Sequence, residues 1–452
     1  MRRLGTTLLP VLLAACNSPS GSSAESSPAA DKPAQTAEKA PVDEKSPAKP
    51  EPPTAADLDD APDEPRPVPT AEPEVVTEVA GGFNHFGIDL YRKVATDDGN
   101  IVISPASVAL ALTMTQAGAR ANTSKEMQTT LHYSRAAPVV QTAVATMLST
   151  WNKDSDMIEL SVVNRLFGEK TVPFEKPFLS LTQRFFQAPL EPVDFKGASE
   201  PARVHINDWV AEQTHDRIKD LIPAGGVTPA TRLALVNAIY FKASWMYEFA
   251  KGRTAPAPFF TADGSRDVPT MHLNKSLAIQ DAPGATVVHL DYQHPGYAMT
   301  LVVPTERDGL GAIEASLGPE LLGEWTGVTK YEQVELSMPK FRITSDSIPL
   351  GKHLQALGIV DAFGGKADFT GIAPASEAVE LSEVFHKGFI EVDESGTEAA
   401  AATAVVARAG SAAMPQDEPR VLKVDRPFLY LIRDKSSGLV LFLGRVTDPK
   451  TE

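Results

Sequence analysis

The apolar positions divide the chain into an N-terminal segment without periodicity and a long patterned remainder. From Asn17 to about Glu74 the sequence is rich in Ser, Ala, Glu and Pro, and its few aliphatic residues are isolated. Such a composition buries too little apolar surface to offset the entropy of ordering, so residues 16–74 are predicted to be a disordered tether. Folded sequence begins near Val75 with apolar residues at helical spacing. These residues are Phe83, Phe86, Leu90 and Tyr91.

A short strand that turns into a helix is predicted over Asn100–Val108. Ser104 is suited to cap this helix, and Pro105 is suited to its first position. The apolar positions that follow continue to Gly118, where we expect the helix to stop. Further along, Leu235–Trp245 is rich in apolar, β-branched and aromatic residues, which predicts a buried strand.

The segment from Glu394 to Gly410 is different, because its alternating rows are small and mostly uncharged. If the segment were a strand, one row would face inward and the other outward. The first row is Thr397, Ala399, Ala401, Thr403 and Val405. The second row is Glu398, Ala400, Ala402 and Ala404. Alanine-rich sequence prefers no single conformation, so we predict a segment that is exposed in one state and inserted between strands in another.

The composition of the 452-residue chain limits the classes of partner that it can bind. A net charge of −16 argues against nucleic acid, which requires clustered Lys and Arg. The hydrophobic fraction of 42% allows a sizeable core. Because the chain has one cysteine, it can form no internal disulfide.

That cysteine follows a basic start and a short apolar stretch, Met1–Ala15. Leu13-Ala14-Ala15-Cys16 resembles the lipobox of bacterial lipoprotein signal peptides. The resemblance implies that residues 1–15 are removed and that Cys16 is lipidated. The alternative is an ordinary secretory signal that contains a cysteine. A lipid anchor places the protein at the bacterial cell envelope, at the outer membrane or cell surface, or outside the cell if it is released.

The sequence contains no recognisable active site. His-Glu-x-x-His, Gly-x-Ser-x-Gly and phosphate-binding glycine motifs are all missing, so we expect no catalytic residues and no cofactor. The histidines are spread singly; His205 and His215 lie ten residues apart, a spacing that does not indicate a metal site. We therefore expect no metal ligands.

Several blocks in fixed order resemble the serpin family from about Val75 to Pro449. Each block alone is weak evidence, but together and in this order they are specific. The blocks are Asn100–Leu112, Gly118–Ser124, Ile206–Val210, Thr214–Ile222, Leu235–Trp245, Met338–Phe341, Leu357–Phe363, Ala367–Gly371, Asp425–Arg433 and Leu441–Val446.

The resemblance implies an α+β serpin fold over residues 75–450. It consists of a large, mostly antiparallel central sheet A, two further sheets, eight or nine helices and an exposed reactive-centre loop at about 394–424. It also implies a shutter cluster beneath the sheet, matched by Ser104, Ser107, Asn237 and His386, and a breach tryptophan, Trp245, where the loop enters. The alternatives are a static buried polar pair and a simple core tryptophan.

Family resemblance further implies inhibition of serine or cysteine endopeptidases as a suicide substrate. The protease cleaves the loop, and the loop then inserts into sheet A with the protease covalently attached. Insertion requires a hinge of small residues. The positions that match this hinge are Glu394, Gly396, Thr397, Glu398, Ala399, Ala400, Ala401, Ala402 and Thr403.

Several neighbouring bonds are candidates for cleavage by the protease. Counting the family's usual distance from Glu394 selects the bond between Gly410 and Ser411, whereas Arg408 followed by Ala409 suits a trypsin-like enzyme. Ala412–Ala413 would suit elastase-like or subtilisin-like enzymes, and we favour the region Arg408–Ser411. The alternative function is a non-inhibitory serpin that acts as a carrier or chaperone. We expect a monomer whose partner is the target protease, with membrane contact through the lipid anchor only.

Overall fold

The computed structural model describes residues 68–153, 155–397 and 418–450. The predicted signal peptide, Cys16 and most of the predicted tether lie outside these residues. The first helix begins at Pro73, two residues before the expected start of the folded sequence, with proline at the favoured first position. Its four predicted apolar residues are all at most 1% exposed.

The described residues form nine α-helices. They are α1 (Pro73–Val94), α2 (Pro105–Gly118), α3 (Ala121–Thr130), α4 (Ala137–Trp151), α5 (Lys176–Phe186), α6 (Phe195–Gln213), α7 (Leu310–Ser316), α8 (Pro319–Thr326) and α9 (Gly351–Leu357). The helix predicted after Asn100 is α2, and its expected cap is confirmed because the Ser104 side chain accepts a hydrogen bond from the Ser107 N–H. None of the described helices has the length and apolarity needed to cross a bilayer.

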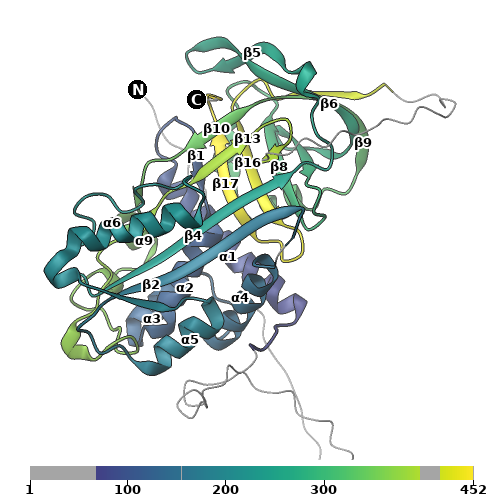
Figure 1. Cartoon of the computed structure of the whole chain (residues 1–452). Helices are drawn as coiled ribbons and strands as arrows, with labels where there is room; N and C mark the ends of the chain where they lie inside the picture. Colours follow the sequence, from purple (N-terminus) through teal and green to yellow (C-terminus); the bar gives the residue numbers. More distant parts are fainter. Residues whose placement is uncertain (1–67, 154, 398–417, 451–452) are drawn as a thin grey trace, which may run out of the picture. The chain divides into compact units, whose positions relative to one another are not determined.

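The described strands form three sheets in which antiparallel pairing predominates, so the predicted serpin-type fold class is confirmed (Figure 1). The six-stranded sheet, called the central sheet below, has the order β10 (Phe341–Thr344), β13 (Phe389–Val392), β14 (Gly396–Thr397), β4 (Leu233–Ser244), β2 (Ile158–Glu169) and β3 (Leu190–Val193). The two-stranded sheet pairs β11 (Ile348–Pro349) with β12 (Phe385–His386).

The nine-stranded sheet contains most of the second half of the chain. Its order is β1 (Ile101–Ile103), β17 (Val440–Val446), β16 (Phe428–Asp434), β8 (Tyr297–Pro304), β7 (Ala285–Asp291), β6 (Gly264–Ala282), β9 (Tyr331–Pro339) and β15 (Arg420–Lys423), with β5 (Ala255–Thr261) paired to β6.

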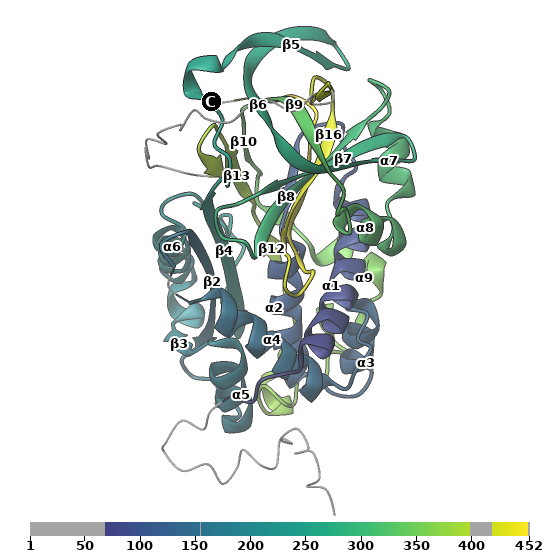
Figure 2. The same ribbon diagram turned by 90° about the vertical axis from the view of Figure 1, so that its right-hand side faces the viewer.

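The central sheet is covered on both faces, with α6 on one side of β2 and β4 and with α2 and α4 on the other (Figure 2). This arrangement follows from alternation along β4. Val236 and Ala238 belong to the apolar cluster that includes α6 residues, whereas Ile239 and Phe241 belong to the main core. The predicted strand Leu235–Trp245 is therefore confirmed as a strand that is buried on two faces.

One buried histidine of the nine-stranded sheet, His289 in β7, is held neutral by its surroundings. The side chain is 5% exposed, its Nε2–H donates to the Trp325 carbonyl at 2.8 Å, and Nδ1 lies 3.4 Å from Arg433 Nη2. Burial lowers the pKa of His289 to about 4, and the positive charge of Arg433 acts in the same direction. Asp291 and Lys435 are the other charged groups that face it, with opposing effects.

Stability should therefore fall with pH below the ordinary histidine pKa. The unfolded chain takes up a proton near pH 6.5 that folded His289 resists down to about pH 4, so its contribution is complete above 6.5 and is lost as the pH falls. Between pH 6.5 and 5 the expected loss is about 2 kcal/mol. Denaturant unfolding of the parent and His289→Gln at both pH values measures it as the difference between the two pH dependences. Equal pH dependences would contradict the assignment.

Candidate functional site

The central sheet contains a strand of only two residues between two longer ones. Gly396 and Thr397, which form β14, pair antiparallel with Ser244 and Ala243 of β4, and Thr397 pairs with Val392 of β13. On its other side β4 pairs with β2 from Leu233 to Ala243. In the described part of the chain, the β14-facing edge of β4 has no strand partner over Leu233–Lys242. We call this stretch the free edge of β4.

Glycine is required at the first position of β14. A Cβ atom on Gly396 would lie 2.1 Å from the Ala243 carbonyl oxygen and 2.8 Å from the Ser244 Cα, and both are backbone atoms that cannot rotate away. The preceding turn is closed by Asp393, whose Oδ1 accepts from the backbone N–H groups of Ser395 at 2.8 Å and Gly396 at 3.2 Å. Thr397 is 2% exposed, and its hydroxyl lies 2.7 Å from the Tyr292 hydroxyl.

Glu394, predicted as the start of an exposed loop, is buried instead, at 6% exposure. Its carboxylate accepts from Lys340 Nζ at 2.9 Å and from the Thr254 hydroxyl at 2.7 Å, which provides the charge partner that a buried carboxylate requires. Burial opposes ionisation, but these two hydrogen bonds outweigh it and hold the pKa of Glu394 below its ordinary value. The exposed-loop prediction is therefore wrong for Glu394–Thr397, all of which are buried.

Trp245 lies beside this turn, at the end of β4. It is 1% exposed, and its indole Nε1–H donates to the Asp393 carbonyl at 3.0 Å. Its backbone N–H donates to the Ser395 carbonyl at 2.9 Å. The ring stacks on Tyr292 with 4.7 Å between centroids. Trp245 therefore contacts the chain at the point where it enters the sheet, the place that the breach interpretation expects.

The four predicted shutter residues lie in one hydrogen-bonded network at the middle of β4, around Asn237. The Ser104 N–H donates to His386 Nε2 at 3.1 Å, and the Ser104 hydroxyl donates to the Leu441 carbonyl at 2.7 Å. The Ser107 hydroxyl donates to Asn237 Oδ1. Burial lowers the pKa of His386 to about 4, so the ring is neutral at pH 7 and its Nε2 can accept a hydrogen bond.

Asn164 completes this network and was not among the predicted site residues. It faces Asn237 in the register of β2 and β4, and its Oδ1 accepts from Asn237 Nδ2 at 2.5 Å. Its own amide donates to the Phe186 carbonyl at 3.0 Å. An asparagine inside the apolar run of β2 was the available signal, because a buried amide needs a partner.

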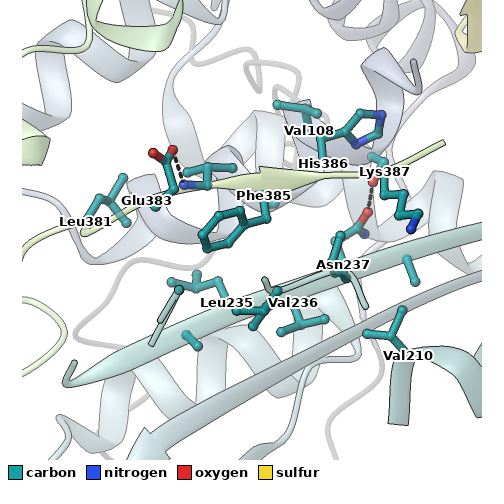
Figure 3. A pocket seen from close by; sticks show the side chains of 18 of the residues that line it. Val108, Val210, Leu235, Val236, Asn237, Leu381, Glu383, Phe385, His386 and Lys387 are labelled. Atoms are coloured by element: carbon teal, nitrogen blue, oxygen red, sulfur yellow. Dashed lines mark hydrogen bonds between the residues drawn. The ribbon is translucent and has the colours of Figure 1, made fainter. Parts of the chain in front are cut away.

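A cavity of about 80 Å³ lies below the free edge of β4 (Figure 3). Val236 and Asn237 line it from β4, Phe385 and His386 from β12, and Val108 from α2. Backbone groups at an unpaired strand edge and an underfilled space beneath them both favour the addition of another extended segment. The remaining predicted hinge residues, Glu398 to Thr403, and the cleavage candidates Arg408 to Ser411 lie outside the described residues.

Comparisons with known proteins agree with this arrangement. The sequence model of the family described as Serpin (serine protease inhibitor) matches residues 82–449. The leukocyte elastase inhibitor of Sus scrofa is 38% identical over 384 residues, which cover 82% of this chain and 100% of the relative.

Two solved structures are similar along almost their whole length. Serpin48 of the insect Tenebrio molitor, described as a highly specific serpin, has a TM-score of 0.73 and 29% identity, covering 82% of this chain and 98% of its own. Human thyroxine-binding globulin complexed with thyroxine has a TM-score of 0.74 and 28% identity, covering 83% and 100%. The family match over most of the chain, together with these relatives, shows that the chain belongs to the serpin family.

Proposed function

We propose that this chain inhibits serine endopeptidases, and cysteine endopeptidases of matching specificity, as a suicide substrate whose cleaved loop inserts beside β4. The observation that carries the proposal is β14: Gly396 and Thr397, near the start of the loop, lie between β13 and β4, and beyond them the edge of β4 has no strand partner among the described residues. Inhibitory relatives such as the leukocyte elastase inhibitor support it.

The observed register predicts the inserted state residue by residue. Gly396 faces Ser244 and Thr397 faces Ala243, so continuing the same antiparallel pairing places Ala399 opposite Phe241 and Thr403 opposite Asn237. These positions share the inward-facing row of β4, where α2 lies beneath. Small residues in this row suit the narrow space, about 80 Å³, that lies beneath the edge.

Glu398 falls on the outward-facing row of the same register, opposite Lys242. The Lys242 side chain is 35% exposed and lies 4.0 Å from Glu159 of β2. Opposite charges that face each other across two strands stabilise the pairing modestly. The one charged residue of the hinge thus meets a cation rather than the core.

Continuing the same register along the free edge places Ala407 opposite Leu233, the residue of the edge farthest from β14. The cleavage candidates Arg408 to Ser411 follow directly. A cut in this region releases the whole length of chain that the edge can pair. In the reaction, the protease hydroxyl or thiol attacks the carbonyl carbon, the peptide bond breaks, and the new amino terminus leaves with the proton. The acyl group on the protease is then moved as the chain inserts.

The driving free energy comes from pairing backbone groups that are unpaired beforehand. Roughly ten residues would add hydrogen bonds to β4, and each bond contributes about 0.5–1.5 kcal/mol net, so the total is on the order of 10 kcal/mol. This is comparable to the whole stability of an ordinary domain. Ordering about ten residues costs roughly 1–2 kcal/mol each, so burial of the inserted side chains must contribute to the driving free energy as well.

The carrier alternative has less support. Thyroxine-binding globulin shows that the fold can bind a small ligand. The cavity beneath β4, however, measures about 80 Å³, below the roughly 300–1,000 Å³ typical of ligand pockets, so the free edge itself offers no carrier site. A larger hollow of about 490 Å³ lies away from this edge, lined by Pro73, Met147 and Ser437.

Incubation with a panel of trypsin-like, elastase-like and subtilisin-like proteases should give a complex that resists SDS with at least one member. The expected complex contains the protease joined through an ester or thioester to the residue before the cut. Mass mapping of the released C-terminal fragment identifies the bond. Cleavage by every enzyme without any complex would refute inhibition and favour the carrier alternative.

Thr397→Arg should convert the inhibitor into a substrate. The parent side chain is 2% exposed and bonded to Tyr292, so an arginine at this position must either bury an unpaired charge or leave the sheet. We expect at least about tenfold more cleaved product per complex formed, since burying the charge costs several kcal/mol.

Thr397→Ser is the matched control, because it keeps the hydroxyl and should trap protease like the parent. An arginine variant that trapped protease at the parental ratio would show that insertion beside β4 is not the mechanism.

Lys242→Glu tests the register itself. It places two carboxylates opposite each other in the inserted state, which should slow trapping about two- to fivefold, the effect of a cross-strand pair of about 0.4–1 kcal/mol. Adding Glu398→Lys restores the opposite-charge pair and should restore the parental rate. The trapping rate of each variant is measured by loss of protease activity with time. If the double variant is slower than Lys242→Glu alone, Glu398 does not meet Lys242.

A further inference from the structure

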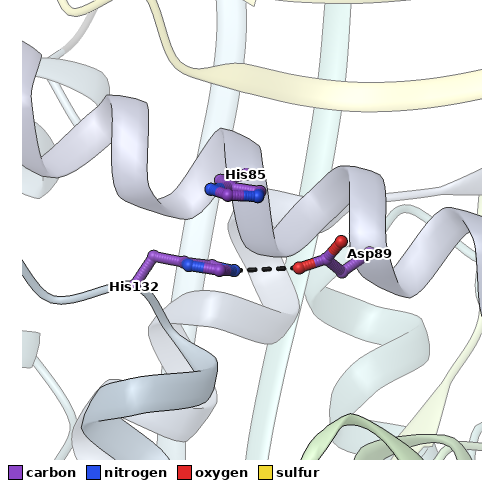
Figure 4. Close-up of side chains that lie close together, drawn as sticks. All are labelled: His85, Asp89 and His132. Atoms are coloured by element: carbon purple, nitrogen blue, oxygen red, sulfur yellow. Dashed lines mark hydrogen bonds and ion pairs between the residues drawn. The ribbon is translucent and has the colours of Figure 1, made fainter. Parts of the chain in front are cut away.

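Two histidines and an aspartate meet where α1 packs beside the end of α3, far along the sequence from the loop (Figure 4). His85 and Asp89 are four residues apart on α1 and therefore share one face of that helix. His132 follows α3. One ligand atom from each of the three side chains can be chosen so that all lie within 4.8 Å of one another. We call these three residues the His-Asp-His cluster.

The contacts inside the cluster exceed those of a simple ion pair. His132 Nε2 lies 2.9 Å from Asp89 Oδ2, with both side chains about 30% exposed at 31% and 28%. The ring of His85 lies parallel on that of His132, with 3.7 Å between centroids and 6° between planes. His85 takes no part in the ion pair, yet it is held directly over it.

The position of His132 is conformationally unusual. Its N–H donates to the Thr129 carbonyl at 3.1 Å and the Tyr133 N–H donates to the Gln128 carbonyl at 3.0 Å, which is the paired closure of a Schellman motif. The residue at this place has φ of 51°, a conformation that favours glycine. Histidine is one of the residues that adopt this conformation most readily, and the motif fixes where its side chain leaves the end of α3.

The backbone around His132 is also pinned against α1. A Cβ on Gly82, one turn before His85, would lie 2.5 Å from the His132 carbonyl oxygen, so glycine allows the α3 end to approach the helix. The imidazole is thereby held next to the α1 face that carries the other two members.

We propose that the His-Asp-His cluster binds a single divalent transition-metal ion, with Zn²⁺ as the best-fitting ion, and fastens α1 to the end of α3. Two imidazole nitrogens and one carboxylate oxygen form a ligand set that Zn²⁺ uses, with water in the fourth position. Nitrogen ligands disfavour Mg²⁺ and Ca²⁺.

To form the site, the His85 ring must leave its parallel stack on His132, because two rings that face each other cannot both point a nitrogen at one ion. Bonds of about 2.0–2.2 Å in a tetrahedron separate ligand atoms by roughly 3.3 Å. The His132–Asp89 distance is already near this value, and rotation of the partly exposed His85 ring brings the third ligand in. Zn²⁺ replaces the proton that His132 Nε2 shares with Asp89.

Protons compete with the metal for the two imidazoles of the cluster. The charged groups that act on His85 are His132, Asp89, Glu320 and Arg92. Because the metal requires neutral imidazoles, its affinity should fall as the pH is lowered.

Isothermal titration of the full chain with ZnCl₂ at pH 7.5 tests the proposal. We expect one high-affinity ion bound by the cluster, at least about tenfold weaker binding in His85→Gln and in His132→Asn, and loss of binding at pH 5.5. Asparagine is chosen for His132 because it tolerates positive φ. In the parent, Zn²⁺ at about 100 times its dissociation constant should raise the thermal midpoint by about 3 °C.

His205→Gln is the matched control, since His205 is also paired with a carboxylate, Glu191, but has no second imidazole beside it. It should bind Zn²⁺ like the parent. Absence of stoichiometric binding in the parent, or parental affinity in both cluster variants, would overturn the proposal. Either result leaves the trapping experiments unaffected.

Discussion

The unpaired edge of β4 is the feature on which the rest of the domain depends. Strand backbones are strong donors and acceptors, and a long strand normally has partners on both sides unless it closes the sheet. Here β4 lies inside the central sheet, and among the described residues its second side is paired only at Ala243 and Ser244. The cavity beneath it leaves packing incomplete as well. The proposed insertion would therefore gain hydrogen bonds and packing contacts that the described residues of the sheet lack.

Buried polar groups lie at one end of this edge and near its middle. At the end near Ser244, the Glu394 carboxylate accepts hydrogen bonds from Lys340 and Thr254. Removing the cation alone would leave an unpaired buried charge and cost several kcal/mol, so this pair holds the start of the loop in place. Below, Asn237 is satisfied by Ser107 and Asn164. Buried networks of this kind specify one arrangement when they are complete and disfavour partial openings. They allow the edge to stay free without the sheet closing or slipping out of register.

Local signals predicted much of the fold, whereas contacts between distant residues were not accessible from the sequence. The hydrogen bond that caps α2 joins Ser104 to Ser107, three residues away, and the alternation of β4 lies within one strand, so local sequence predicts both. By contrast, Glu394 and Thr254 are 140 residues apart, and no local pattern shows that a charged turn residue will be buried. The His-Asp-His cluster falls between these cases: the four-residue spacing of His85 and Asp89 was visible, but His132 is joined to them only by the packing of α3.

The free edge also separates the two tasks of the loop. In the proposed inserted state, every residue up to Ala407 has a position opposite β4, so its size and charge are constrained by a core that is already built. Residues from Arg408 onward have no such partner, and only the pocket of a protease selects among them. Target specificity can therefore change through the second half of the loop while the hinge and the sheet stay the same. This accounts for a loop whose first half is mostly alanine and threonine, with Glu398, Val405 and Val406, and whose second half contains arginine, glycine, serine and methionine.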